Sequence, residues 1–155
     1  MFPSTVHRVA EQTAANVNEE IRRRTEESIV RHAAAAGPDA IDGRLAELDR
    51  EWDIERTLEA NAAIASLVGL TLGATVSRKW FFFPAVVAGF LLQHAVQGWC
   101  PPLTVFRRLG VRTQTEIDYE RYALKALRGD FRHLPADGAA RTPSAAGRAL
   151  QAATS

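Results

Sequence analysis

The sequence has little cysteine and little lysine, and each shortage narrows what the protein can be. Cys100 is the one cysteine among 155 residues, which excludes an internal disulfide framework and a zinc cluster held by several cysteines. Only Lys79 and Lys125 of the 19 basic residues are lysine, and the formal net charge is +1. So small a charge provides no strong non-specific attraction to nucleic acid, and we expect no nucleic-acid partner.

The start of the chain also lacks an apolar run of the kind that a secretory signal needs. We therefore expect the N-terminus to stay in the cytoplasm. Residues 1–37 are expected to form one polar helix, because weakly apolar residues recur at spacings of three and four. Residues 22–24 are three consecutive arginines. They could contact lipid headgroups, but neighbouring glutamates favour a solvated, paired helix face.

The next segment, 38–59, has the pattern of an amphipathic helix. Gly37-Pro38 separates it from the polar helix. Ile41, Leu45, Leu48 and Trp52 follow at spacings of four, three and four, which places them on one face. The other face is rich in acidic residues with interleaved arginines, which is typical of a salt-bridged surface rather than a metal cluster. We expect this helix to continue without a break into the segment that follows.

The segment 60–105 contains two long runs without formal charge. The first covers the 17 residues 60–76, and the second includes the 20 residues 80–99 before Cys100-Pro101-Pro102. At about 1.5 Å per residue these runs span roughly 25 and 30 Å, close to the hydrocarbon core of about 30 Å. We predict an all-α fold: a transmembrane helical hairpin flanked by amphipathic cytoplasmic or interfacial helices. The alternative is a soluble bundle, but a domain this small cannot bury two helices on all sides.

Two residue patterns within and beside these runs favour the membrane. Trp52, Trp80 and Trp99 are expected at the membrane interface, since aromatic belts form there. Small residues recur every four positions and would let helix backbones approach closely, either within the hairpin or in a dimer, and the short turn favours the hairpin. These predicted packing residues are Ala65, Gly69, Gly73, Ala85 and Gly89.

Basic residues predict the orientation in the membrane. Three arginines precede the first run and three follow the second, whereas the turn holds only Arg78 and Lys79. By the positive-inside rule both termini are expected in the cytoplasm, and the membrane is expected to be the bacterial inner membrane. Arg107 and Arg108 are expected at its surface.

The last part of the chain divides into two segments. Residues 106–133 are expected to form an interfacial segment and then an amphipathic helix. Thr113 and Glu116 have the spacing of a capping box at the start of that helix, and Gly129 is a plausible end. Residues 134–155 are dominated by Pro, Gly, Ala, Ser and Thr, which predicts a disordered tail.

About half of the chain, from residue 49 to residue 131, resembles the YgaP-like transmembrane domain family. The resemblance rests on the hairpin ending in Gly98-Trp99-Cys100-Pro101 and on Leu109-Gly110-Val111-Arg112-Thr113 after it. The flanking sequences 51–56 and 120–131 look like a stand-alone branch of that family. The resemblance implies a self-associating membrane hairpin. It implies no sulfur transfer, because the relatives with that activity carry their reactive cysteine in a separate domain that this chain lacks.

Two features could carry chemistry. Cys100, at the expected end of the second helix, could be a reactive thiol, but a helix C-terminus disfavours a thiolate and a structural role is the preferred interpretation. Gln93, His94 and Gln97 form a polar patch within the membrane. The patch could bind haem, quinone or a metal, but one histidine with no nearby carboxylate makes a metal site improbable. An interhelical hydrogen bond, for example to Ser66 or Thr71, or solvation near the interface is preferred.

We found no catalytic constellation, and we expect neither enzyme activity nor a cofactor or metal. The sequence predicts an integral inner-membrane protein with a structural or accessory role. Its expected partners are the lipid bilayer and either further copies of itself or the subunits of a membrane complex. The alternative function is a thiol-dependent sulfur carrier or redox sensor that uses Cys100.

Overall fold

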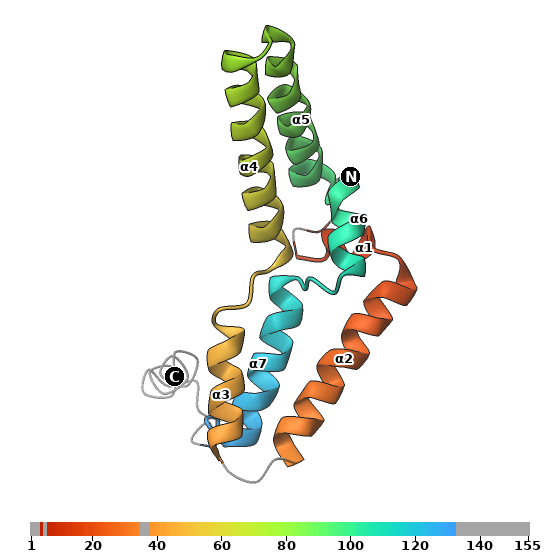
Figure 1. Cartoon of the computed structure of the whole chain (residues 1–155). Coiled ribbons are helices and arrows are strands. Elements are labelled where there is room, and N and C mark those ends of the chain that lie inside the picture. Colours follow the sequence, from red (N-terminus) through yellow and green to blue (C-terminus); the bar gives the residue numbers. More distant parts are fainter. Residues whose placement is uncertain (1–3, 5, 35–37, 133–155) are drawn as a thin grey trace, which may run out of the picture. The chain divides into compact units, whose positions relative to one another are not determined.

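The computed structural model describes residue 4, residues 6–34 and residues 38–132. This described part is helical and contains no strand (Figure 1). It divides into two compact units. Unit 1 comprises the described residues of Met1–Arg24 and Glu51–Ile117, and unit 2 those of Thr25–Arg50 and Asp118–Ser155. The predicted disordered tail, 134–155, lies outside the described residues.

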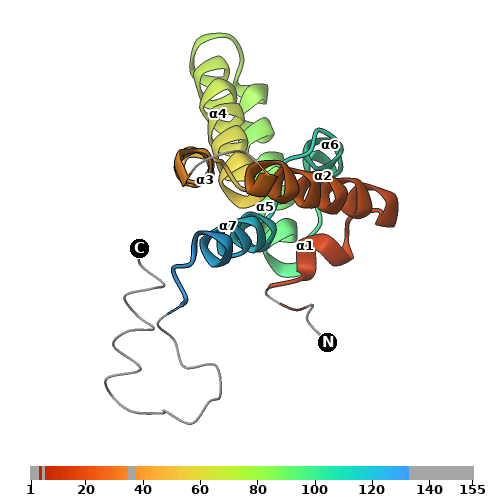
Figure 2. The same cartoon turned by 90° about the horizontal axis from the view of Figure 1, so that it is seen from below.

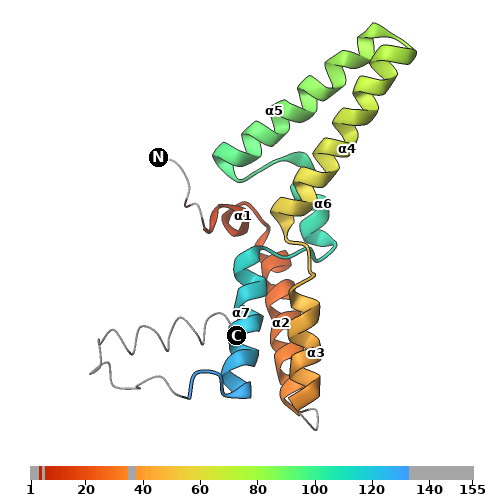
Figure 3. The ribbon, with the colours of Figure 1, turned by 90° about the vertical axis from the view of Figure 1, so that its left-hand side faces the viewer.

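Two helical segments in unit 1 are long and apolar enough to cross a membrane: Ile54–Thr75, which is α4, and Arg78–Gln97. The second consists of the 3-10 turn η1, Arg78–Phe81, and helix α5, Phe82–Gln97. Pro84 lies in the first turn of α5, where its missing N–H costs little. Helices α4 and α5 run side by side from the turn, as Figures 1 and 3 show.

Helix α4 begins later than predicted, because a non-helical segment separates α3 from α4. Helix α3 is Pro38–Leu48, and α4 begins only at Ile54. Asp53 caps α4, since its side chain accepts a hydrogen bond from the backbone N–H of Arg56 (2.9 Å). The prediction of one continuous helix from 38 into the apolar run was therefore wrong. A capping aspartate inside an acidic stretch is hard to distinguish from a surface charge by periodicity alone.

The predicted single N-terminal helix is also divided. Helix α1 is Arg8–Glu11 and helix α2 is Ala15–Ala34. Side chains satisfy the carbonyls at the end of α1: Thr13 Oγ1 donates to the oxygen of Val9 (2.7 Å), and Asn18 Nδ2 donates to the oxygen of Ala10 (2.8 Å). These bonds replace the helical ones and allow the chain to turn.

The hydrophobic core of unit 1 lies where α1 and α6 meet the first turns of α4. Helix α6 is Pro101–Arg108. Trp99, Phe106 and Val111 pack around the buried cluster. The cluster consists of Val9, Ile54, Leu58, Cys100 and Leu103. Helix α1, although short, therefore contributes Val9 to the core.

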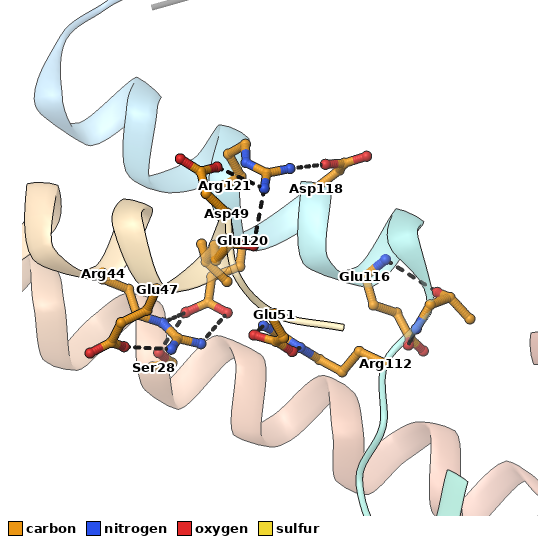
Figure 4. A network of polar contacts seen from close by, with 12 residues as sticks. Ser28, Arg44, Glu47, Asp49, Glu51, Arg112, Glu116, Asp118, Glu120 and Arg121 are labelled. Atoms are coloured by element: carbon orange, nitrogen blue, oxygen red, sulfur yellow. Dashed lines mark hydrogen bonds and ion pairs between the residues drawn. The ribbon is translucent and has the colours of Figure 1, made fainter. Parts of the chain in front are cut away.

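Unit 2 contains helix α3 and parts of α2 and α7, seen from below in Figure 2. Its buried residues include Leu45, Leu48 and Leu124, together with the fully buried carboxylate of Glu120. Arg44 donates two hydrogen bonds to Glu120 (2.8 and 3.0 Å), and Ser28 donates a third (2.6 Å) (Figure 4). These bonds connect α2, α3 and α7, so a polar contact stabilises the interior of this unit.

Helix α7, Gln114–Arg128, has the ends that the sequence predicts. The backbone N–H of Thr113 donates to Glu116 (2.7 Å), and that of Glu116 donates to the Thr113 hydroxyl (3.3 Å), which confirms the capping box (Figure 4). Gly129 follows the last turn with a φ of +95° and donates to the oxygen of Lys125 (3.0 Å). A left-handed glycine is a common helix end.

Candidate functional site

A buried polar cluster lies at the end of α4 and α5 opposite their connecting turn. His94 of α5 is 2% exposed, and its Nε2 donates to Glu55 Oε2 of α4 (2.8 Å). The other oxygen of Glu55 accepts a hydrogen bond from Arg8 of α1 (2.8 Å). One carboxylate thus connects three helices of unit 1.

The second ring nitrogen of His94, Nδ1, is buried and has no hydrogen-bond partner among the described residues. With Nε2 bonded to a carboxylate, Nδ1 is the ring nitrogen that stays available. That pattern occurs in metal-binding histidines, whose other nitrogen is held by a carboxylate. The described residues contain no group of three His, Cys, Asp or Glu side chains that could hold a metal ion.

The predicted polar patch does not act as one site. Gln93 is half-buried and Gln97 is exposed, whereas His94 is buried against Glu55. The expected interhelical hydrogen bond is present, but its partner is Glu55 and not Ser66 or Thr71. The hydroxyl of Thr71 instead donates to the backbone oxygen of Leu67 in its own helix (2.8 Å). The statement that no carboxylate lies near His94 was wrong, because folding brings together residues 39 positions apart.

Cys100 lies in a different place from the one predicted. Helix α5 ends at Gln97, and Cys100 is the N-cap residue of α6 rather than the last residue of the preceding helix. The side chain is 4% exposed. Burial raises the pKa of the Cys100 thiol, and the Glu55 carboxylate raises it further, while a backbone hydrogen bond with Leu103 opposes them. A buried thiol with a raised pKa is poorly suited to nucleophilic or redox chemistry.

Gly98 allows α1 to pack against the end of α5. Its φ is +76°, a left-handed conformation that closes the helix with a hydrogen bond to the oxygen of His94 (2.7 Å). A Cβ at this position would lie 2.8 Å from the backbone oxygen of Arg8. Conformation and space both require glycine here, so Gly98 supports the placement of the Arg8 side chain beside Glu55.

Arg107 lies inside unit 1 and not at a surface. It is 1% exposed and forms two hydrogen bonds with Glu116 (2.7 Å each), and it also donates to Asn18 (2.9 Å) and Thr13 (3.3 Å). Burial alone would raise the pKa of Glu116, but the Arg107 and Thr113 hydrogen bonds outweigh it and lower that pKa below its ordinary value. Of the two arginines predicted at the membrane surface, only Arg108 is exposed.

The small residues of α4 and α5 have two different surroundings. A Cβ on Gly69 would meet Pro84 at 2.7 Å, and one on Gly73 would meet Phe81 at 2.7 Å. Ala85 and Gly89 are exposed, and Gly89 has nothing within 4 Å of a Cβ built on it. The glycines of the first run therefore pack against the second segment, whereas the small residues of the second run face outward. Ala65 is half-buried and lines a cavity.

The three tryptophans also differ in their surroundings. Trp52 and Trp80 are exposed, and the guanidinium of Arg56 lies 4.4 Å from the centre of the Trp52 ring. That distance is within the range of a cation–π contact. Trp99 is half-buried and packs on the core cluster of unit 1.

Sequence reasoning missed Arg8, Glu55 and Gly98 as members of this cluster. Glu55 shares a helix face with Leu58 and Ala62, so a charged residue on the inward-facing stripe was a usable signal. No comparable local signal exists for Arg8. No family model, no curated protein and no solved structure matches the chain.

Proposed function

We propose that this is an integral membrane protein in which α4 and the η1–α5 segment cross the bilayer as a helical hairpin. One observation carries this proposal: only 17% of the apolar window in α4 and 6% of that in the second segment are buried inside the protein. The core helix of a soluble protein would be mostly buried. Water does not tolerate so much apolar helix surface, so lipid is the environment that suits it.

The exposed apolar side chains cover both helices. In water, apolar surface of this extent would drive aggregation, whereas hydrocarbon solvates it without cost. Hydroxyl and amide side chains on α4, among them Thr71 and Asn61, donate to backbone oxygens of their own helix and so suit a lipid environment. The large exposed apolar residues include Ile64, Leu67, Val68, Leu70, Phe82, Phe83, Val86, Phe90, Leu92 and Val96.

The proposed orientation places both termini in the cytoplasm of a bacterium and the turn containing Arg78 and Lys79 on the other side of the inner membrane. In this orientation the exposed Pro102, Val105 and Leu109 of the α6 region would lie at the lipid–water boundary. We also propose membership of the YgaP-like transmembrane domain family, on the residues that carry the resemblance.

The proposed role is structural or accessory, exercised by self-association or as a small subunit of a membrane complex. Gly69 and Gly73 pack against the η1–α5 segment of the same chain. Contacts with a helix of another molecule are therefore assigned to the outward-facing Ala85 and Gly89. Small residues in this arrangement let a second helix approach closely in lipid.

Two measurements test the proposal. Alkaline carbonate extraction should leave the full chain in the membrane pellet, and its release to the supernatant would favour a soluble bundle. In mild detergent, Gly89→Leu should reduce the size of the assembly, while the matched variant Ala63→Leu, on the exposed face of α4, should not. An unchanged assembly in Gly89→Leu would exclude this face as the contact.

A further inference from the structure

A cavity of about 270 Å³ lies in unit 1 between α4, α5 and α6. Leu58, Ala62 and Ala65 form its α4 side, Leu91 belongs to its α5 side, and Phe106 and Cys100 close it near α6. Close contact through Gly69 and Gly73 occurs near the turn, and Figure 3 shows the two helices farther apart away from it. The cavity occupies this wider part.

The chemistry of the wall favours an apolar ligand. Asn61 is the one amide in the wall, and its Nδ2 already donates to the backbone oxygen of Thr57 (2.8 Å). The Cys100 thiol is neutral at physiological pH because its pKa is raised by burial. Among the described residues no charged side chain lines the cavity, so the cavity suits an apolar ligand.

The cavity is large enough to hold an apolar ligand. An apolar cavity of about 150 Å³ is large enough to bind benzene, and this one is larger. Leaving it empty would remove dispersion contacts from all of its walls. The half-exposed Phe90 in its wall adjoins the outward apolar surface of α5, so the cavity is continuous with the surface assigned to lipid.

We infer that the cavity binds one acyl chain of a bilayer phospholipid, which completes the packing between α4, α5 and α6. This inference rests on the proposed membrane insertion. The acyl chain enters from the hydrocarbon core of the bilayer between α4 and α5, and its methylene groups contact Ala62, Ala65 and Leu91. The acyl chain thereby fills the space that larger side chains at Ala62 and Ala65 would otherwise occupy.

The test uses the full chain in vesicles of phosphatidylethanolamine and phosphatidylglycerol that contain a phosphatidylglycerol with a diazirine midway along one acyl chain. After illumination, mass spectrometry of peptides locates the attached lipid. We expect labels on Ala65 or Leu91 in the cavity as well as on the outward-facing Leu67 and Leu92. Ala62→Phe should abolish the cavity labels by filling the space, and the matched Ala63→Phe should retain them.

The outward labels separate the possible failures. Labels on Leu67 and Leu92 without cavity labels in the wild type would overturn the acyl-chain assignment and leave membrane insertion intact. If the wild-type protein lacks cavity labels and its measured size is that of a dimer, a side chain of the second copy fills the cavity. No label at either place would overturn the proposed function and the inference together. If Ala62→Phe loses its outward labels through misfolding, Ala65→Phe replaces it. Cavity labels that persist in a correctly inserted filling variant would contradict the inference.

Discussion

Glu55 and His94 are 39 residues apart in the sequence, yet their side chains meet at 2.8 Å, with His94 Nε2 donating to the carboxylate. The same carboxylate accepts a hydrogen bond from Arg8, so it connects α1, α4 and α5. His94 has no other described hydrogen-bond partner for its ring, since Nδ1 is unpaired. Loss of Glu55 would leave the buried imidazole with neither nitrogen satisfied.

Glu55→Ala is therefore expected to lower the free energy of unfolding by about 1–3 kcal/mol, the cost of an unsatisfied buried donor. Heat or denaturant unfolding in detergent, followed by circular dichroism, measures the change. Glu59→Ala is the matched control, because Glu59 is an exposed glutamate one turn further along the same helix. Equal effects in the two variants would contradict a role for the Glu55–His94 contact.

Gly98→Ala should destabilise unit 1, since alanine at a φ of +76° costs about 1–2 kcal/mol and its Cβ would also meet the backbone of Arg8. Gly43→Ala, at an exposed glycine inside α3, should be neutral or stabilising by up to about 1 kcal/mol, because helical alanine is favoured over glycine and the space is open. Thermal unfolding of both variants compares them directly. A Gly98→Ala protein as stable as the wild type would show that α1 is not held in this place.

The Arg107–Glu116 pair predicts a dependence of stability on pH. The pKa of Glu116 is lowered in the folded protein, so the pair contributes stability above the unfolded pKa of about 4.3. That contribution is lost as the pH falls through the lower folded pKa. Glu116→Gln should therefore be less stable than the wild type at neutral pH, and the difference should shrink on acidification below about pH 4. A melting temperature measured at several pH values tests this, with Glu59→Gln as control; parallel curves for wild type and Glu116→Gln would refute it.

The Cys100 thiol should react slowly with N-ethylmaleimide at mildly alkaline pH, because it is buried and its raised pKa leaves little thiolate. Reaction should become fast once the protein is unfolded in dodecyl sulfate. Ser77→Cys in a Cys100→Ala background places a thiol in the exposed turn and should react rapidly in the folded state. Rapid alkylation of native Cys100 would revive the sulfur-carrier or redox-sensor function.

Removal of Glu120 should destabilise unit 2 strongly. Arg44 would lose two hydrogen bonds from a partly buried guanidinium, and breaking a buried pair costs about 3–5 kcal/mol. Glu47 pairs with the same arginine at the surface (2.9 Å), so Glu47→Ala should cost only about 0–1 kcal/mol. Unfolding curves of Glu120→Ala and Glu47→Ala provide the comparison, and similar midpoints would show that the buried pair adds nothing.

Local features of the fold could be predicted from sequence because their signals lie within a few residues. The capping box joins residues three apart, and the left-handed backbone of Gly129 ends the helix within one residue of its last turn. The two apolar helical segments could be predicted equally directly, because residues 60–76 and 80–105 contain no formal charge.

Tertiary structure decided the pairing of charges and the surroundings of the small and reactive residues. The acidic residues of 42–51 were expected to pair with nearby arginines, and Glu47 does pair with Arg44 in its own helix. Asp42 and Asp49 instead pair with Arg128 and Arg121 in unit 2, and Glu51 pairs with Arg112 in unit 1. Spacing along one helix could not reveal these partners, because they lie 61 to 86 positions away in the sequence. Similarly, Gly69 and Gly89 look alike in sequence, and which of them faces another helix depends on how the second segment folds back on the first.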